Sequence, residues 1–579
     1  MVQNVLSSML ADLYGQESAL DLADRIERLA GKYPAPPVFP AESVLTEENL
    51  LLITYADSLR QSDQPPLQTL ARFHDEFCRD LISLVHLLPF FPYSSDDGFS
   101  VIDYRQVNPS LGDWSDVRQL AQRVGLCFDL VINHASAHSE AFQRFLAGDP
   151  AYQGFFLTAD PHADTSTVLR PRTSPLLTPF DSPSGTKHVW TTFSADQVDW
   201  NFQNPEVLLE FLDILFFYVS QGACIIRLDA IAYLWKQLGT SCAHLPQTHL
   251  VVRILRLVLD TFFPHVLVLT ETNVPHPQNV SYFGDGSNEA HLVYNFPLPP
   301  LLLYALTASD ASYLTQYARQ MRPPSQNTAF LNFTASHDGI GVRPAAGRLT
   351  PDEFQTLVDL AARHGGHVSS KADQTGRPIP YELNINYFDA INDPNVSADP
   401  DIEIRRFLCS QSVALVLAGV PVIYIHSLLG SRNWTDGPGQ TGQPRSINRE
   451  KLDYRALSDE LNDPRSLRGR LFPRYAHMIR TRRRVKAFHP NAPQTILDLS
   501  NACFAVLRHS LDHEQTILAL HNVTGDDLLL EIPLAAIHGK RGGEFVDLLS
   551  QHAFRCNEDG ALRVRLAPWD FAWLERTEE

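Results

Sequence analysis

The sequence predicts a (β/α)₈ barrel (TIM barrel, α/β class) with two loop-insertion subdomains, a helical N-terminal extension and a C-terminal all-β domain. Eight short apolar runs are each followed by a helix-length amphipathic stretch, and this alternation is typical of a parallel sheet covered on both faces. Eight such units favour a closed barrel over an open sheet. Towards the end of the chain, strand-like runs recur roughly every ten residues, which indicates a separate β domain.

The helical extension is predicted over residues 1–48. Residues 17–30 place their apolar side chains on one helix face, and Gly31 stands where a helix would end. The segment that follows, residues 32–43, reads KYPAPPVFPAES. It cannot be helical because proline has no amide donor, so we expect an extended connector there.

The barrel is predicted over residues 49–490. Its eight strands are expected at Leu51–Tyr55, Leu84–Phe90, Leu126–Ile132, Cys224–Leu228, Val266–Thr270, Leu292–Phe296, Phe330–Thr334 and Val420–Ile425. Two gaps are too long for one connecting helix, and both leave from the carboxyl ends of strands, where barrels build active sites. We expect insertions at 135–195 and 343–400, after the third and seventh strands, and the β domain at 491–579.

The composition is that of an acidic globular protein. Apolar residues make up 44% and charged residues 20% of the chain, which excludes wholesale disorder. Lys and Arg number 47 against 66 Asp and Glu, so the net charge is 47 − 66 = −19; we expect no binding to nucleic acid or membrane. The chain shows no spanning apolar stretch and no signal-peptide pattern. Seven scattered cysteines without a CxxC pair fit a cytoplasmic protein rather than a disulfide scaffold.

Charged residues interrupt the apolar runs where the predicted strands end. Asp229 ends one strand two positions after Arg227, Glu271 follows the next strand, and His337 and Asp338 follow another. Further polar residues at strand ends are Asp96, Asn133 and His134. Each residue alone could be a strand-end cap or half of a local ion pair. Because the strand ends of a barrel meet at one mouth, the set indicates three carboxyl groups around one pocket.

Grouped carboxyl groups are suited to cleaving acetals. A carboxyl group that its neighbours keep protonated can donate to the leaving oxygen, and one that a cation keeps ionised can attack the anomeric carbon. Asp229 beside Arg227 suits the ionised role, and Glu271, after an apolar run, suits the protonated role. Asp338 remains for stabilising the charge of the transition state.

The order of these motifs resembles the α-amylase superfamily of retaining α-glycoside enzymes, over nearly everything from residue 50 onward. The sucrose phosphorylase group is the most similar branch, on the strings LPFFPYSSDDGFSVIDY, VLRPRTSPLLTPF, IIRLDAIAYLWKQLGTSC, SHDGIGV and SINR. Within that branch, LITYADS, ETNVPH, PYELN and LGSRN look most like glucosylglycerate phosphorylases. The resemblance implies reversible phosphorolysis of 2-O-α-D-glucosyl-D-glycerate to α-D-glucose 1-phosphate and D-glycerate through a β-glucosyl-enzyme.

The resemblance also implies roles for individual residues. Asp229 matches the nucleophile, Glu271 the general acid/base and Asp338 the transition-state stabiliser. Residues implied to bind the glucosyl unit are Asp96, Phe99, His134, Phe193, Arg227, His337 and Arg445. Arg172 and Tyr381 match loop residues near the phosphate or acceptor. Glu382 stands where sucrose phosphorylases carry Gln, which argues against fructose as the acceptor.

Phosphate must compete with water for the covalent intermediate, and cations would concentrate and orient it. Candidate cations on the two long loops and beside the nucleophile strand are Arg170, Arg172, Lys236, Lys371 and Arg377. Because glycerate is also an anion, one cationic subsite could serve both the departing acid and the incoming phosphate. The alternative for each cation is a solvated loop charge.

Other functions remain open at this stage. They are phosphorolysis of sucrose or sucrose 6-phosphate, an α-glucosidase or transglucosidase activity, and an inactive amylase-like binding protein. The chain shows no glycine-rich nucleotide motif, and its acidic cluster at Asp393, Asp399 and Asp401 lacks the Gly and Glu of a calcium loop. We therefore expect no cofactor and no metal, a sugar and inorganic phosphate as small-molecule partners, and a monomer or homodimer.

Overall fold

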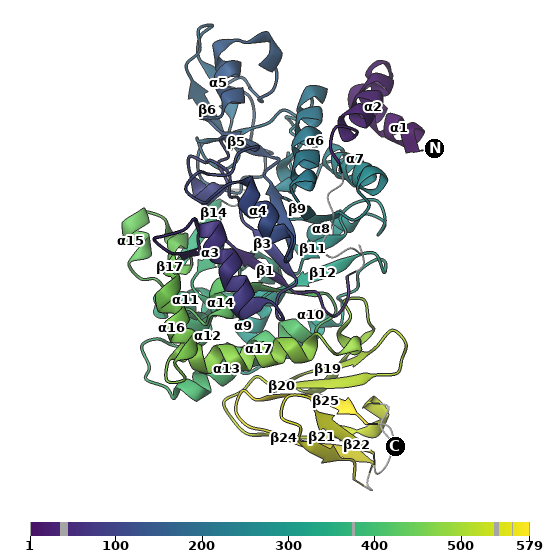
Figure 1. Ribbon diagram of the computed structural model, residues 1–579, viewed down its shortest axis with the longest axis vertical. Coiled ribbons are helices and arrows are strands. Elements are labelled where there is room, and N and C mark those ends of the chain that lie inside the picture. Colours follow the sequence, from purple (N-terminus) through teal and green to yellow (C-terminus); the bar gives the residue numbers. More distant parts are fainter. Residues whose placement is uncertain (1, 35–44, 373–376, 538–542, 558–559, 578–579) are drawn as a thin grey trace.

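A closed barrel of eight parallel strands forms the centre of the protein, and it confirms the predicted fold class (Figure 1). The structure is a computed structural model that describes residues 2–34, 45–372, 377–537, 543–557 and 560–577. The barrel strands are β1 (Leu51–Thr54), β3 (Leu84–Leu87), β4 (Gly125–Leu130), β9 (Ala223–Leu228), β10 (Leu267–Thr270), β11 (Leu292–Tyr294), β12 (Ala329–Asn332) and β16 (Val420–Tyr424). Each matches one predicted apolar run, because every residue of these strands is buried.

Helices surround the barrel between its strands. They are α3 (Pro66–Phe73), α4 (Trp114–Ala121), α6 (Pro205–Ser220), α7 (Pro246–Phe262), α8 (His276–Val280), α9 (Leu298–Ala308), α10 (Ser312–Ala318), α13 (Pro400–Val416) and α17 (Leu467–Arg482). Local sequence fixes where they begin: Asp113 and Asp116 form a capping box at α4, and Asn204 caps α6 before a proline at its first position. None of the described helices combines the length and apolarity that crossing a membrane would require.

Two long excursions leave the carboxyl ends of the barrel strands. The first, after β4, carries β5 (His134–Ser136), α5 (Glu140–Ala147), β6 (Leu177–Phe180), β7 (Lys187–Trp190) and β8 (Gln197–Asp199). The second, after β12, carries β13 (Ile340–Gly341), α11 (Pro351–Arg363), β14 (His367–Ala372), β15 (Pro378–Asn384) and α12 (Tyr387–Ile391). Strand β15 lies between β13 and β14, and a register shift leaves Tyr381 unpaired against β14. Such a bulge redirects side chains and is common beside active sites.

After β16 the chain returns over the barrel mouth before it enters α17. This return holds α14 (Ile425–Leu428), α15 (Gly437–Thr441), the 3₁₀ turn η7 (Pro444–Asn448), β17 (Leu452–Asp453) and α16 (Tyr454–Asn462). Strand β17 pairs with β2 (Leu59–Arg60), which follows β1. The return therefore joins the last barrel unit to the first.

The N-terminal residues form two helices, α1 (Val2–Tyr14) and α2 (Gln16–Ala30), beside α6 and α7 (Figure 1). The predicted helix over 17–30 is confirmed, and it ends at Gly31. Arg25 of α2 forms an ion pair with Glu206 of α6 at 2.6 Å, and the Tyr14 hydroxyl donates to the Phe202 carbonyl at 2.9 Å. The proline-rich connector lies mostly outside the described residues, which omit 35–44.

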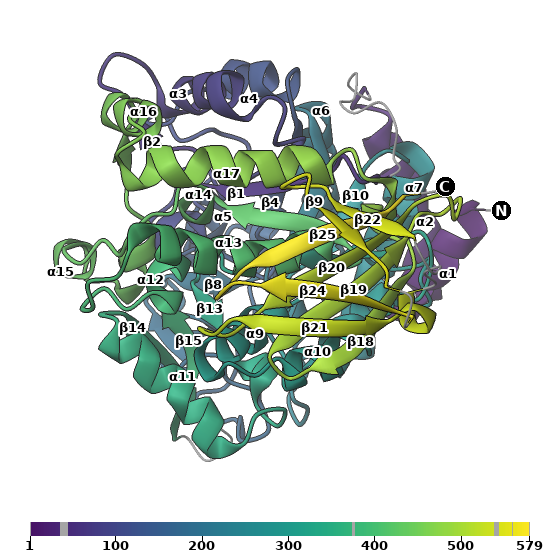
Figure 2. The same ribbon diagram turned by 90° about the horizontal axis from the view of Figure 1, so that it is seen from below.

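The C-terminal segment folds into β-sheets. Its strands are β18 (Gln494–Ser500), β19 (Cys503–His509), β20 (Thr516–Asn522), β21 (Leu528–Pro533), β22 (Glu544–Asp547), β23 (Ala553–Arg555), β24 (Ala561–Leu566) and β25 (Phe571–Arg576). Six of them form one sheet in the order β18-β19-β20-β25-β22-β23, and β21 pairs with β24. The sheet lies against α13 (Figure 2), where the Ser412 hydroxyl contacts His521 and Trp573, each at 2.8 Å. The predicted all-β character of this segment is confirmed, although the short strand β23 was not predicted.

Two fully buried arginines join the barrel to this sheet. Arg482, at the end of α17, donates to the carbonyls of Leu415 at 3.3 Å and Phe488 at 2.9 Å. Arg508, in β19, donates to the carbonyls of Val416 and His489. Both guanidinium groups therefore satisfy carbonyls at the carboxyl end of α13, where a helix has unpaired acceptors.

Candidate active site

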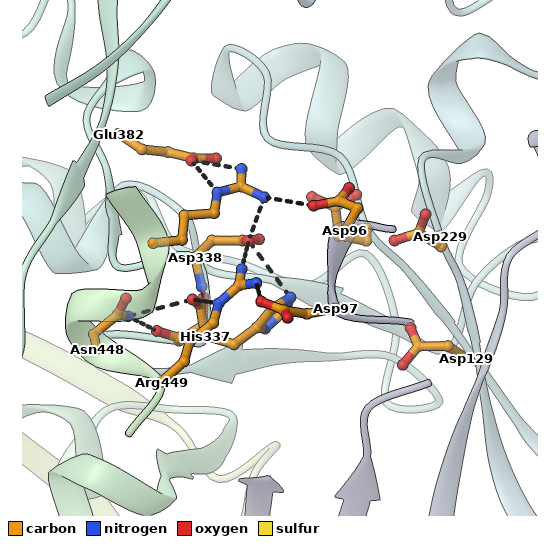
Figure 3. Close-up of polar contacts among 12 residues, drawn as sticks. Asp96, Asp97, Asp129, Asp229, His337, Asp338, Glu382, Asn448 and Arg449 are labelled. Carbon is orange, nitrogen blue, oxygen red and sulfur yellow. Dashed lines mark hydrogen bonds and ion pairs between the residues drawn. The ribbon is translucent and has the colours of Figure 1, made fainter. Parts of the chain in front are cut away.

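The three carboxyl groups predicted to act together line one cavity at the carboxyl ends of the barrel strands. Asp229 directly follows β9, Glu271 directly follows β10, and Asp338 lies in the turn after β12. A parallel barrel brings all its strand ends to one face, so the positions of these residues in the fold account for their convergence. Figure 3 shows Asp229 and Asp338 with their charged neighbours.

A chain of buried charges holds Asp229 in place. Arg227 Nη1 donates to Asp229 Oδ1 at 2.8 Å, and the same nitrogen forms a second ion pair with Asp129. Asp129 is fully buried, and its other oxygen lies 2.7 Å from His86 Nε2. Burial opposes the charge of Asp129, but Arg227 and His86 lower the pKa of its carboxyl. Asp129 therefore holds Arg227 in place, and Arg227 Nη1 is shared between Asp129 and Asp229.

Asp229 and Glu271 influence each other's ionisation. Burial and the charge of Glu271 raise the pKa of Asp229 against the opposing effect of Arg227. Burial raises the pKa of Glu271 as well, and the charge of Asp338 adds to the increase. Among the described residues, the one hydrogen bond that Glu271 accepts is long, 3.3 Å, and comes from the Ala230 amide. Ala230 has a left-handed backbone (φ 49), a strained turn that aims this amide at Glu271.

Asp338 lies between two arginines. Arg445 Nη1 and Arg449 Nη2 each lie 3.1 Å from Asp338 Oδ1. Burial opposes the charge, but Arg445, His337 and Arg449 lower the pKa of Asp338 below its ordinary value. Arg449 also donates to Asp97 at 2.6 Å and to the His337 carbonyl at 2.8 Å (Figure 3). Asp338 is thus held as an anion, in contrast to the raised pKa values of the other two carboxyl groups.

The residues implied to bind glucose all line the same cavity. They are Asp96, Phe99, His134, Phe193, Arg227, His337 and Arg445. The Phe99 ring stacks on His337 with centroids 5.4 Å apart and an angle of 7°. His134 Nε2 lies 2.9 Å from the Phe99 carbonyl oxygen. Asp96 has a left-handed backbone (φ 55), so its turn is strained in a way that is common at binding sites.

The candidate acceptor residues divide into two groups. Arg172, Tyr381 and Glu382 line the cavity. Glu382 accepts a 2.6 Å hydrogen bond from Arg445; burial raises the pKa of Glu382, and Arg445 opposes the increase.

Arg170 and Lys236 are not among the cavity-lining residues. Arg170 donates to the Ser174 carbonyl, and the Lys236 ammonium lies 2.7 Å from both Asp199 and the Asn133 side-chain oxygen. Lys236 follows β9 in sequence, but its side chain is turned into this buried ion pair.

Several residues of the site were not assigned from the sequence. They are Asp97, Asp129, Gln197, Tyr233, Asn273 and Arg449. Gln197 Nε2 donates to Asp96 Oδ2 at 3.2 Å and so supports the carboxylate of Asp96. Four of the missed residues stood inside strings already singled out: Asp97 in SSDDG, Tyr233 in IIRLDAIAYLWKQLGTSC, Asn273 in ETNVPH and Arg449 in SINR. A polar or charged residue inside a string that carries the resemblance could therefore have been predicted to belong to the site.

Comparison with known proteins agrees with this geometry. The family description "Alpha amylase, catalytic domain" matches residues 80–340. Proteins named glucosylglycerate phosphorylase are 48% identical in Spirochaeta thermophila (90% of this chain, 89% of that protein) and 50% identical in Allomeiothermus silvanus (84% and 87%). The Escherichia coli protein of that name is 41% identical (91% and 92%).

Solved structures share the fold at lower identity. The sucrose 6F-phosphate phosphorylase from Thermoanaerobacter thermosaccharolyticum superposes with a TM-score of 0.72 at 24% identity, covering 90% of this chain and 98% of that one. An α-amylase from H. orenii superposes with a TM-score of 0.68 at 16% identity, covering 92% of this chain and 100% of that one. From the more similar sequences above, this chain belongs to the glucosylglycerate phosphorylase family, a group of glycoside phosphorylases with the α-amylase catalytic domain.

Proposed function

We propose that the protein catalyses the reversible phosphorolysis of 2-O-α-D-glucosyl-D-glycerate to α-D-glucose 1-phosphate and D-glycerate, with retention at the anomeric carbon. The observation that carries the proposal is the shared cavity of Asp229, Glu271 and Asp338, with Arg227 bonded to Asp229 at 2.8 Å. The names of the relatives that cover most of this chain supply the substrate class.

The first step forms a covalent glucosyl-enzyme. Asp229 Oδ attacks the anomeric carbon while Glu271 gives its proton to the glycosidic oxygen, the bond between that carbon and that oxygen breaks, and glycerate leaves. Asp229 accepts a charge-assisted hydrogen bond from Arg227, whereas Glu271 accepts a long bond from the Ala230 amide. The charge-assisted bond favours the ionised form of Asp229, and we assign the proton that is transferred to Glu271.

The second step transfers the glucosyl unit to phosphate. A phosphate oxygen attacks the same carbon from the side the acid has left, Glu271 takes the phosphate proton, and the ester bond to Asp229 breaks. Two inversions retain the α configuration. Asp338 stays ionised between Arg445 and Arg449, so its charge is available to stabilise the positive carbon of both transition states.

Sucrose and sucrose 6-phosphate are the alternative substrates. Proteins named sucrose phosphorylase are 31% identical in Agrobacterium vitis, below the values for the glucosylglycerate phosphorylases. The buried, acidic Glu382 on Arg445 is the specific feature of this cavity that argues against fructose as the acceptor.

A transfer assay tests the proposal. The full chain is incubated with α-D-glucose 1-phosphate and, separately, with D-glycerate, glycerol, fructose or fructose 6-phosphate, and released phosphate is measured. We expect the fastest release with glycerate and none with the Asp229→Asn variant. Faster release with fructose or fructose 6-phosphate would refute the acceptor, and equal release without any acceptor would indicate a hydrolase instead.

A further inference from the structure

A buried lysine, Lys236, takes no part in the chemical steps above, yet its side chain joins three segments of the chain. Lys236 follows β9, and its ammonium lies 2.7 Å from Asp199 Oδ2 in β8 and 2.7 Å from Asn133 Oδ1 after β4. The side chains of Lys236 and Asp199 are 2% and 0% exposed. The Thr192 amide donates to the other Asp199 oxygen at 3.1 Å. Charge-assisted hydrogen bonds in such a dry environment hold the side chains that they join in one orientation.

Lys236 determines how the Asn133 amide is oriented. An ammonium group can only donate, so the Asn133 atom that faces it must be the oxygen. The amide nitrogen is therefore turned the other way, where it lies 3.2 Å from His134 Nδ1 and 3.4 Å from Asp199 Oδ2. Because an amide NH₂ group can only donate, His134 Nδ1 must accept and carries no proton.

The other ring nitrogen of His134 agrees with this assignment. His134 Nε2 lies 2.9 Å from the Phe99 carbonyl oxygen, which can only accept, so the proton of the neutral ring is on Nε2. Gln197 Nε2 lies 3.1 Å from the same ring nitrogen and would donate to it if the proton moved to Nδ1. That second tautomer requires the Asn133 amide to flip, which would turn its NH₂ group toward the Lys236 ammonium. Lys236 therefore selects between two tautomers of a ring that lines the catalytic cavity.

The charge of Lys236 acts on the same ring. Burial lowers the pKa of His134 below its ordinary value. Charged groups from three elements modify this effect, because Asp199 and Asp96 raise the pKa of His134 and Lys236 lowers it. Asp199 stands opposite His134 in the register of β8 and β5. Without Lys236, Asp199 would be an unpaired buried anion beside the ring and would favour its protonated form.

We propose that Lys236 is a positioning residue, which acts through Asn133 to keep His134 neutral with its proton on Nε2. The inference rests on the proposed function, in which His134 is one of the residues expected to bind the glucosyl unit. A ring held in one tautomer offers the sugar a fixed pattern of hydrogen bonding, and preorganised polar groups of this kind lower the barrier to reaction.

The first test observes the ring itself and needs no turnover. The full chain is prepared with ¹⁵N-labelled histidine, and the His134 signals are identified by their loss in the His134→Gln variant. In the unaltered protein we expect the ¹⁵N shifts of a neutral ring that is protonated on Nε2. Lys236→Met should replace them at pH 7 with the shifts of a ring that is protonated on Nδ1, either alone or together with Nε2. Unchanged shifts in Lys236→Met would overturn the proposal.

Two further variants complete this test. Arg256→Met is the matched control, because the Arg256 side chain is 8% exposed, pairs with Asp260 at 2.7 Å and does not line the cavity. It should leave the His134 shifts unchanged. Asn133→Asp keeps the shape of the side chain and leaves Lys236 in place, so it serves even if Lys236→Met does not fold. It presents an acceptor to His134 Nδ1, and a ring that still carried no proton on Nδ1 would refute the assignment.

The second test measures how kcat/KM for transfer from α-D-glucose 1-phosphate to D-glycerate depends on pH. In Lys236→Met the acid limb of the profile should move upward by about one pH unit, because the unpaired carboxylate favours the protonated ring. Adding Asp199→Asn removes that carboxylate, and the limb should return toward its original position. A loss of equal size at every pH, or a double variant that recovers nothing, would reduce Lys236 to a structural role and overturn the proposal. If the unaltered protein transfers glucose to no acceptor, the proposed function itself fails, whereas the histidine signals still decide the role of Lys236.

Discussion

Arg449 offers the most demanding test of how the site is held together. Its side chain is 4% exposed and makes three polar contacts: with Asp338 at 3.1 Å, Asp97 at 2.6 Å and the His337 carbonyl at 2.8 Å. The change to Gln keeps a polar side chain and removes the charge. Arg449 is not among the residues that line the cavity, so we treat it as a positioning residue.

The expected magnitude follows from these contacts. Two charges 3.1 Å apart interact by on the order of 5 kcal/mol at an effective dielectric constant of about 20. Water offsets part of the loss, because the Asp338 and Asp97 side chains are 29% and 42% exposed. We therefore expect the free energy of unfolding to fall by about 3 kcal/mol, the low end for a broken buried pair. We expect kcat/KM to fall about 100-fold, because displaced catalytic groups cost that much.

Urea denaturation and phosphate release measure the two effects on the full chain. Arg455→Gln is the control, since Arg455 pairs with Asp63 at 3.2 Å on the surface, with both side chains more than half exposed. That variant should change the unfolding free energy by less than about 1 kcal/mol. Arg449→Lys should recover part of kcat. If Arg449→Gln kept both the urea midpoint and kcat/KM of the unaltered protein, the reasoning about Asp338 would be wrong.

Further predictions concern individual groups. Glu271→Gln should slow phosphorolysis about 10²–10⁴-fold, but should slow the consumption of α-glucosyl fluoride less, since fluoride leaves without a proton; equal losses would contradict the acid role. If the candidate cation Lys371 binds the acid, the KM for glycerate should rise as the pH passes upward through about 8, where Lys371 loses its proton and charge, and Lys371→Arg should shift that rise to higher pH; superimposable profiles would count against a role of Lys371 in binding the acid. Asp129→Asn should lower the free energy of unfolding by about 3–5 kcal/mol, measured in urea, because it breaks a buried ion pair; an unchanged midpoint would disprove that pairing. Gly98→Ala should destabilise the protein in a thermal melt, because φ is +111° and the new Cβ would lie 2.6 Å from the Pro89 carbonyl oxygen; a normal melting temperature would show that the turn can relax.

Much of the fold could be predicted because the barrel strands are buried on both faces. The run Val420–Ile425, for example, contains no charged residue that would interrupt its apolar pattern, and it corresponds to β16 in the structure. The short strand β23 was missed because two of its three residues are exposed and it has no apolar alternation. Register and pairing, including the bulge at Tyr381, depend on the neighbouring strand and leave no mark within one segment.

The sequence indicated the residues of the site that follow strands, and missed those that act through distant contacts. Asp229 and Glu271 stand directly after apolar runs, so their positions were visible. Arg449 reaches Asp97 across 352 positions of the chain, and no local pattern encodes such a pair. Lys236 is the opposite case. Its position shortly after the strand that ends at Asp229 made it a candidate to bind phosphate, but its ammonium forms an ion pair with Asp199.

The buried arginines beneath the barrel limit how the protein can be shortened. Arg508 lies in β19 of the terminal sheet, but its guanidinium donates to the Val416 carbonyl at the end of α13, the helix that leads into β16. A polypeptide that stopped at residue 490 would keep every group proposed for catalysis and lose the cation that satisfies the Val416 carbonyl. Truncations and domain swaps should therefore keep the barrel and its terminal sheet together.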